Sequence, residues 1–137
     1  MRPLVLILED EASVATMLED ALKDEGYDVV KAGTAAEFRR TVASREIDMF
    51  LMDVNIPDGS GLNLVKEIRK VSDVGIILLT GRADEMDKVV GLEIGADDYI
   101  AKPVRLRELR ARINAVYRRT QANRSRPLNL DGANAQA

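Results

Sequence analysis

The sequence of 137 residues carries a net charge of −3 and contains neither cysteine nor histidine. A chain of this length fits one domain with its own hydrophobic core. The two missing residue types exclude disulfides, thiol nucleophiles, thiolate or imidazole metal ligands and histidine general bases. Any metal must therefore be bound by oxygen, which favours Mg²⁺, Mn²⁺ or Ca²⁺ over Zn²⁺. No apolar run approaches the ~18 residues of a membrane span, and acids directly follow the first short apolar run, so we expect a cytoplasmic protein without membrane contact.

Five short apolar runs predict β-strands. They cover residues 4–8, 28–32, 49–52, 75–80 and 99–101. The first, third and fourth runs are almost continuously apolar, as expected for strands that are covered on both faces of a sheet.

Stripes of apolar residues at helical spacing lie between these runs. The first stripe consists of Val14, Leu18 and Leu22, with Ser13 as the candidate N-cap and Gly26 as the candidate residue just after the helix. Similar stripes predict helices around residues 35–43, 62–68, 86–94 and 106–116.

Strands that alternate with helices predict an α/β fold, a doubly wound, five-stranded parallel sheet with helices on both faces. We take the strand order 2-1-3-4-5, which is one of the two common orders for such sheets. Residues 1–120 form the predicted domain. The polar, aperiodic segment 121–137 is predicted to be a linker or a disordered tail.

Polar residues follow four of the predicted strands. They are Glu9 and Asp10 after the first strand, Asp53 after the third, Thr80 at the end of the fourth and Lys102 after the fifth. The carboxyl ends of parallel strands lie at one edge of a sheet, and open α/β sheets bind ligands there. With the assumed strand order, the acids after the first and third strands face each other.

Three neighbouring carboxylates repel one another, and a divalent cation relieves this repulsion. An aspartate can also act as a nucleophile and form an aspartyl phosphate, with a lysine and a threonine hydroxyl contacting the phosphoryl oxygens. An aspartate after a strand is, taken alone, more often a turn or cap residue. The acids and the lysine in register with Asp53 favour the functional interpretation.

At these positions the sequence resembles the receiver domain of two-component response regulators. The motifs "LILEDE", "FLMDVNIPDGSGL", "IILLTGR" and "GADDYIAKP" carry the resemblance, which extends over residues 3–120. It implies a flavodoxin-like (βα)₅ fold with Asp53 as the phosphoacceptor. It also implies Mg²⁺, with Mn²⁺ as the alternative, bound by Asp10, Asp53 and the backbone carbonyl of Asn55, and by Glu9 through water.

The same resemblance assigns the other site residues and the partner. Thr80 and Lys102 would bind the phosphoryl group, and Thr80 together with Tyr99 would form the switch that reports phosphorylation. The bond between Lys102 and Pro103 is typically cis in this fold. The phosphoryl group would come from a sensor histidine kinase or a phosphotransfer protein.

The stretch "GADDYIAKPVRLRELRARINAVYRR" is similar to the OmpR/PhoB class of transcriptional regulators, and in part to regulators of trimethylamine-N-oxide or dimethyl-sulfoxide respiration. Such regulators bind DNA through a C-terminal winged-helix domain, which this sequence does not contain. Their receivers dimerise on phosphorylation through the fourth helix, fifth strand and fifth helix. By that resemblance, the matching charges here would pair across a two-fold axis between two chains, as Lys88 with Glu108, Asp98 with Arg112, and Asp97 with Arg119.

Two other functions remain as alternatives. A stand-alone receiver would dock on an effector that does not bind DNA. An Mg²⁺-dependent phosphatase of the haloacid-dehalogenase type would also use an aspartate nucleophile, but it typically carries a second aspartate where this sequence has Asn55.

Overall fold

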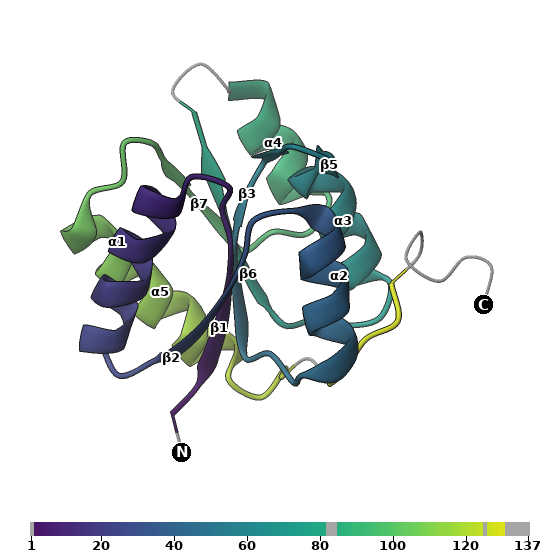
Figure 1. The fold of residues 1–137 in the computed structure, drawn as a ribbon, viewed down its shortest axis with the longest axis horizontal. Helices are drawn as coiled ribbons and strands as arrows, with labels where there is room; N and C mark the ends of the chain where they lie inside the picture. The colour runs from purple at the N-terminus through teal and green to yellow at the C-terminus, as the bar shows by residue number, and fades with distance from the viewer. Residues whose placement is uncertain (1, 82–84, 125, 131–137) are drawn as a thin grey trace.

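The fold is built on a five-stranded parallel sheet. The computed structural model describes residues 2–81, 85–124 and 126–130, without the side chains of residues 85–88. The strands are β1 (Leu4–Leu8), β2 (Asp28–Ala32), β3 (Met49–Asp53), β6 (Gly75–Thr80) and β7 (Asp98–Ala101). They lie in the order β2-β1-β3-β6-β7, and every pair is parallel (Figure 1). Counted within this sheet, the order is 2-1-3-4-5, which confirms the predicted fold class.

The five predicted helices are all present. They are α1 (Ala12–Asp24), α2 (Ala35–Ser44), α3 (Gly61–Arg69), α4 (Glu85–Glu93) and α5 (Leu106–Thr120). Within the described residues, no helix is long and apolar enough to cross a membrane.

The start of α1 differs from the prediction. Glu11 is the N-cap residue and makes no side-chain cap hydrogen bond, so the prediction of Ser13 as the cap is wrong. The helix begins two residues earlier because the amide of Ala15 already donates to the carbonyl of Glu11 at 2.9 Å. The other end of α1 is as predicted, since Gly26 follows the C-cap with a φ of 97°, which glycine adopts without strain.

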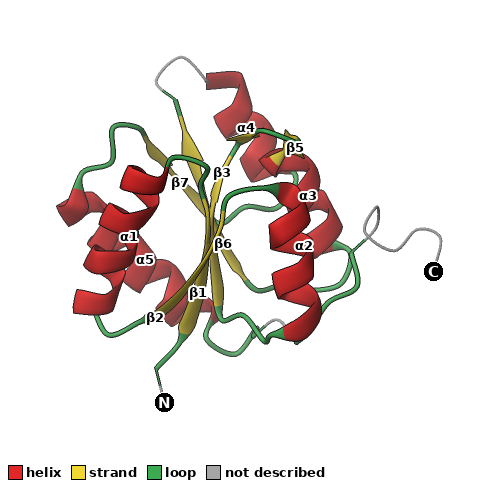
Figure 2. Ribbon diagram, in the orientation of Figure 1, coloured by secondary structure: helices red, strands yellow, loops and turns green. Residues whose placement is uncertain are grey.

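The sheet separates two hydrophobic cores. One core lies between the sheet and the pair α1 and α5, and the other lies between the sheet and the layer that includes α2 and α3 (Figure 2). Alternate residues of β3 face the two layers, so Phe50 and Met52 belong to one core and Met49 and Leu51 to the other. This burial on both faces explains the continuous apolar runs.

A short hairpin follows β3. Strands β4 (Asn55–Ile56) and β5 (Gly59–Ser60) pair in antiparallel register. The carboxylate of Asp58, at the tip of the hairpin, accepts hydrogen bonds from the amides of Ala35 at 2.6 Å and Ala36 at 3.1 Å. The hairpin is therefore fixed to the first turn of α2.

We expect Gly61→Ala to destabilise the fold at this hairpin. A Cβ atom on Gly61 would overlap the carbonyl oxygen of Asp53 and lie 3.0 Å from the Cα of Val54. Such overpacking costs ~1–3 kcal/mol, which urea unfolding at neutral pH would measure. Gly59→Ala is the matched control, because its nearest contact would be an ordinary 3.8 Å from the Cβ of Ala35. Equal stability of the two variants would contradict the overlap.

Candidate functional site

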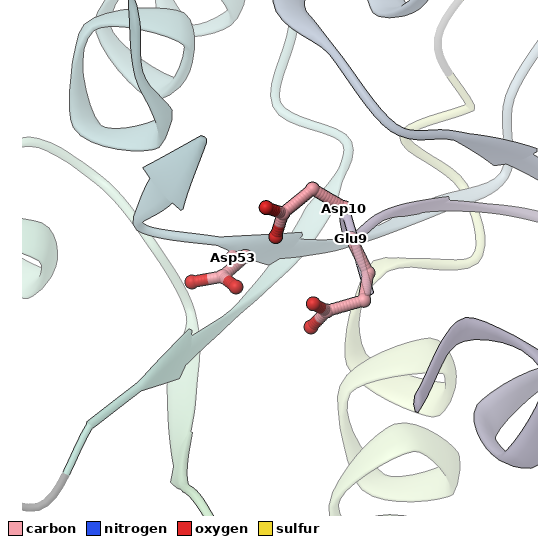
Figure 3. A group of neighbouring side chains, drawn as sticks. All are labelled: Glu9, Asp10 and Asp53. Atoms are coloured by element: carbon pink, nitrogen blue, oxygen red, sulfur yellow. The ribbon is translucent and has the colours of Figure 1, made fainter. Parts of the chain in front are cut away.

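Three carboxylates gather at the carboxyl edge of the sheet. Asp53 is the last residue of β3, and Glu9 and Asp10 follow β1, the strand that pairs with β3. Oxygen atoms of the three groups lie within 4.8 Å of one another, and Figure 3 shows the side chains converging from the two strands. Glu9 and Asp53 are buried, whereas Asp10 is exposed. The structure thus brings together the acids that the sequence predicted to meet.

Lys102 joins the two buried carboxylates. Its Nζ lies 2.6 Å from Oδ2 of Asp53 and 2.8 Å from Oε1 of Glu9. The backbone amide of Lys102 donates to the carbonyl of Thr80 at 2.7 Å, which ties the residue to the end of β6. The bond to Pro103 is cis, as the resemblance implied.

Backbone amides hold the remaining oxygen of each buried carboxylate. The amide of Asn55 donates to Oδ1 of Asp53 at 3.0 Å, and the amide of Glu11 donates to Oε2 of Glu9 at 3.1 Å. Both carboxylates are therefore held in position from two sides. A rigid, oriented carboxylate is what a nucleophile or a metal ligand requires.

Burial and crowding act against ionisation of Glu9. Burial is the largest cause that raises its pKa, and the neighbouring charge of Asp53 adds to it, while the hydrogen bonds from Lys102 and the Glu11 amide act in the opposite direction. For Lys102, burial lowers the pKa, but the hydrogen bonds to Asp53 and Glu9 outweigh it and the pKa is raised. Lys102 is thus held as a cation between two anions.

The hydroxyl of Thr80 is buried without a partner. Thr80 is the last residue of β6 and is fully buried, and its Oγ1 makes no hydrogen bond within the described part of the chain. A buried, unsatisfied hydroxyl costs ~1–3 kcal/mol. Leu79, the residue before it, is the register partner of Asp53. A hydroxyl with an unused hydrogen so close to the carboxylates is suited to donate a hydrogen bond to an oxygen of a bound ligand.

The donor set of this edge fits an oxygen-bound divalent cation. It offers three carboxylates and one lysine, so it retains negative charge. Hard cations such as Mg²⁺ take carboxylate oxygens and keep several waters. Asn55, which the resemblance assigns as a carbonyl ligand, is exposed and adjoins the cluster through its amide. Its role as a ligand stays a prediction.

Tyr99, the predicted switch residue, lies on the edge strand β7. Its register partner is Leu78 of β6, and its half-buried side chain packs against the core that includes Phe38 and Phe50. Tyr99 and Thr80 therefore sit on neighbouring strands. Their role as a switch stays a prediction.

The predicted dimer charges make contacts within the single chain. Arg112 forms ion pairs with Asp98 and with Glu108, both at 2.9 Å. Arg119 is exposed, and the side chain of Lys88 lies outside the described residues. The predicted pairing across a two-fold axis stays a prediction.

Asp97, the remaining dimer candidate, is bonded to Arg69, a residue that the sequence analysis did not single out. Oδ2 of Asp97 lies 3.0 Å from a terminal nitrogen of Arg69 and accepts from the amide of Ile76 at 2.8 Å. The same guanidinium donates to the carbonyls of Val74 and Gly95. Arg69 thereby ties the end of α3 to the starts of β6 and β7. The sequence feature that could have pointed to Arg69 is its position as a basic residue in the last turn of α3.

Comparison with known proteins assigns the chain and its fold to one family. The family described as "Response regulator receiver domain" matches residues 5–114. Its match covers the five strands and all of the acidic and basic residues at the carboxyl edge.

Three curated relatives show what kind of protein carries such a domain. The TorCAD operon transcriptional regulatory protein TorR of Escherichia coli K12 is 41% identical over 128 residues, which cover 93% of this chain and 56% of TorR. The transcriptional regulatory protein AruR of Pseudomonas aeruginosa is 42% identical, covering 88% of this chain and 52% of AruR. The aerobic respiration control protein ArcA of Escherichia coli K12 is 43% identical, covering 86% and 50%. This chain spans about half the length of these relatives.

Solved structures agree with this assignment. The receiver domain of TorR, the response regulator of the TMAO respiratory system, superposes with a TM-score of 0.81 at 42% identity, covering 85% of this chain and 98% of that domain. A putative response regulator from Chloroflexus aurantiacus gives a TM-score of 0.82 at 32% identity, covering 86% and 99%. These matches confirm the fold and the kinship with regulators of the TorR and ArcA type.

We expect Lys102→Met to destabilise the fold at neutral pH in the presence of EDTA. The substitution leaves two buried carboxylates without their cation, at a cost of ~1–3 kcal/mol. Urea unfolding would measure this loss. Lys31→Met is the matched control, because Lys31 pairs with Glu19 at the surface and such pairs contribute only ~0–1 kcal/mol.

The pH dependence of this loss follows from Glu9. Because its folded pKa is already raised above 4.5, ionisation of Glu9 lowers stability as the pH rises, and loss of Lys102 raises that pKa further. The deficit of Lys102→Met is therefore complete at neutral pH and shrinks as the pH falls through the raised pKa toward 4.5. A deficit that grows on acidification would contradict this assignment.

Proposed function

The chain belongs to the response regulator receiver domain family, and from this premise we propose that it accepts a phosphoryl group on Asp53. The observation that carries the proposal is the buried Asp53 carboxylate, held 2.6 Å from Lys102 Nζ beside the carboxylates of Glu9 and Asp10. The domain acts in signalling. Its self-phosphorylation and slow dephosphorylation at Asp53 are part of the proposal.

The proposed reaction transfers phosphorus from nitrogen to oxygen. A carboxylate oxygen of Asp53 forms the new O–P bond while the N–P bond of a phosphohistidine on a sensor kinase or phosphotransfer protein breaks, and the leaving imidazole retains the bond electrons and takes up a proton. Oδ1 receives a hydrogen bond from the Asn55 amide, so Oδ2, which now contacts Lys102, is the oxygen we assign as the nucleophile.

Each neighbouring group has a separate task. Lys102 would move from the carboxylate to the transferred phosphoryl oxygens, and the unpartnered hydroxyl of Thr80 would donate to another of them. Asp10, Asp53 and the Asn55 carbonyl would hold Mg²⁺, or Mn²⁺ in its place, and Glu9 would bind the ion through water. When bound, the ion supplies positive charge that offsets the charge of the phosphoryl group.

We expect acetyl phosphate with Mg²⁺ to label the wild-type protein with one phosphoryl group per chain, and Asp53→Asn to remain unlabelled, because an amide is not a nucleophile. Intact-protein mass spectrometry would measure both. Thr80→Val is the matched variant. It removes an unsatisfied hydroxyl and should fold with equal or higher stability, yet label about tenfold more slowly or worse. Labelling of Asp53→Asn at wild-type stoichiometry would disprove the assignment.

We also propose that phosphorylation leads to a homodimer, and through it to control of DNA binding. TorR and AruR are named as transcriptional regulators, and this chain would correspond to their receiver part, with residues 1–120 as the domain. DNA would be bound only by a winged-helix domain beyond it. Movement of Thr80 toward the phosphoryl group would let Tyr99 repack and alter the neighbouring surface of α4, β7 and α5.

The surface formed by α4, β7 and α5 has the composition of an interface. Val89 and Leu92 of α4 are exposed apolar residues, and the charged cluster of Asp98, Glu108 and Arg112 lies on β7 and α5. Since these charges are already paired within one chain, dimerisation would exchange or extend existing pairs. These charges would then determine which partner binds and how the two chains align, more than how tightly they bind.

We expect beryllofluoride with Mg²⁺ to double the mass of the wild-type protein in light scattering. Arg112→Ala should weaken this dimer, because it removes the group that binds both Asp98 and Glu108. Arg107→Ala, an exposed residue of the same helix, should have no effect. A wild-type protein that binds the mimic and stays monomeric would refute the dimer, while the phosphoacceptor assignment would stand.

A further inference from the structure

The segment after α5 crosses from one face of the sheet to the other. Helix α5 packs with α1 in one core, through residues such as Ile113 and Val116. Leu128 and Leu130 belong to the opposite core, the one that includes residues of α2 and α3. In Figure 1 this segment is drawn in yellow and runs from the end of α5 toward the side of α2 and α3.

Two leucines and one backbone hydrogen bond hold the segment 126–130, which we call the strap. Leu128 and Leu130 are buried, at 8% and 3% exposure, while Asn129 between them is exposed. This alternation is that of an extended chain with one side against a surface. The amide of Leu128 donates to the carbonyl of Val42 near the end of α2 at 2.6 Å. Pro127 restricts the backbone at the start of this contact and reduces the freedom that docking removes.

Arg124 fixes the chain just before the strap. Its Nε lies 2.8 Å from Oδ1 of Asp48, and a terminal nitrogen lies 3.1 Å from Oε1 of Glu46. Asp48 is itself held, because its Oδ2 accepts from the amide of Leu4 at 2.7 Å. The anchor thus joins the segment to the amino ends of β1 and β3.

We propose that the strap is a docking element of the receiver that places the exit of the chain on the face of α2 and α3, away from α5. The occupant of the apolar surface near Val42 is this chain's own segment. Whatever follows the strap in a longer regulator is then tethered on that face, and the surface of α4, β7 and α5 remains clear for a second copy. The contacts that carry this proposal do not involve the site at Asp53, so it stands or falls independently of phosphorylation.

Amide hydrogen exchange in the whole chain, without Mg²⁺ or phosphoryl donor, tests the docking. The Leu128 amide should exchange at least about tenfold more slowly than an unprotected amide. Leu130→Ser should remove this protection while the amides of β3 stay protected, which shows that the domain is still folded. Met17→Ser is the control, because Met17 is an exposed apolar residue of α1, on the opposite side of the sheet, and its loss should leave Leu128 protected. An unprotected Leu128 amide in the wild type would overturn the proposal.

A spin label tests the side on which the strap lies. The chain has no cysteine, so a nitroxide can be attached at one introduced site, Ala43→Cys on α2 or Ala111→Cys on α5, both exposed positions. The α2 label should broaden the amide signals of Leu128 and Leu130 more strongly than the α5 label. The reverse order would overturn the proposal. Broadening that appears only between labelled and unlabelled chains in a mixture would also overturn it, because the strap would then dock on a second copy.

Discussion

The structure depends on one electrostatic constraint, the burial of two carboxylates beside a third at the edge of the sheet. Glu9 and Asp53 lie in the protein interior with Lys102 as their shared cation. Two negative charges and one positive charge leave the group incompletely neutralised, and burial, with the neighbouring charge of Asp53, raises the pKa of Glu9. The folded protein thereby maintains an affinity for further positive charge at this point. That remaining negative charge favours binding of the proposed metal ion, whose positive charge would then offset that of the phosphoryl group.

The surrounding structure holds this unfavourable arrangement in place. Strand β3, which ends at Asp53, is buried along its whole length and pairs with β1 and β6. The hairpin after it is fixed to α2 through Asp58, and α3 begins at Gly61, so close to the Asp53 carbonyl that a side chain would not fit. A carboxylate on a flexible loop would move away from its neighbours. Here the backbone on both sides of Asp53 is constrained, so the repulsion persists in the folded state.

The sequence predicted those features that follow from periodicity and from strand ends. Asp53 and Lys102 could be placed together because parallel strands end at one edge, a rule that needs no side-chain detail. Ser13 was misassigned as a cap because the choice among neighbouring polar residues depends on the path of the loop after β1. The pairing of Arg69 with Asp97 joins residues 28 positions apart, and local patterns do not reveal such contacts. The sequence does not predict the strap, because its apolar residues alternate over only three positions in a polar segment.

The anchor at Arg124, just before the proposed strap, and the phosphoacceptor Asp53 lie at opposite ends of the same strand, and this limits how a signal can travel. Arg124 binds Asp48, directly before β3, whereas Asp53 is the last residue of β3. The five residues from Met49 to Asp53 are buried and paired with β6, and the first four are also paired with β1, so β3 cannot lengthen or slide without breaking both ladders. We therefore expect a change at Asp53 to leave the strap in place and to move side chains instead, the Thr80 hydroxyl, which has no hydrogen bond within the described residues, and the half-buried Tyr99 on the edge strand. In this view the strap provides a fixed tether beside α2, and the switch alters the surface of α4, β7 and α5 at the edge of the sheet.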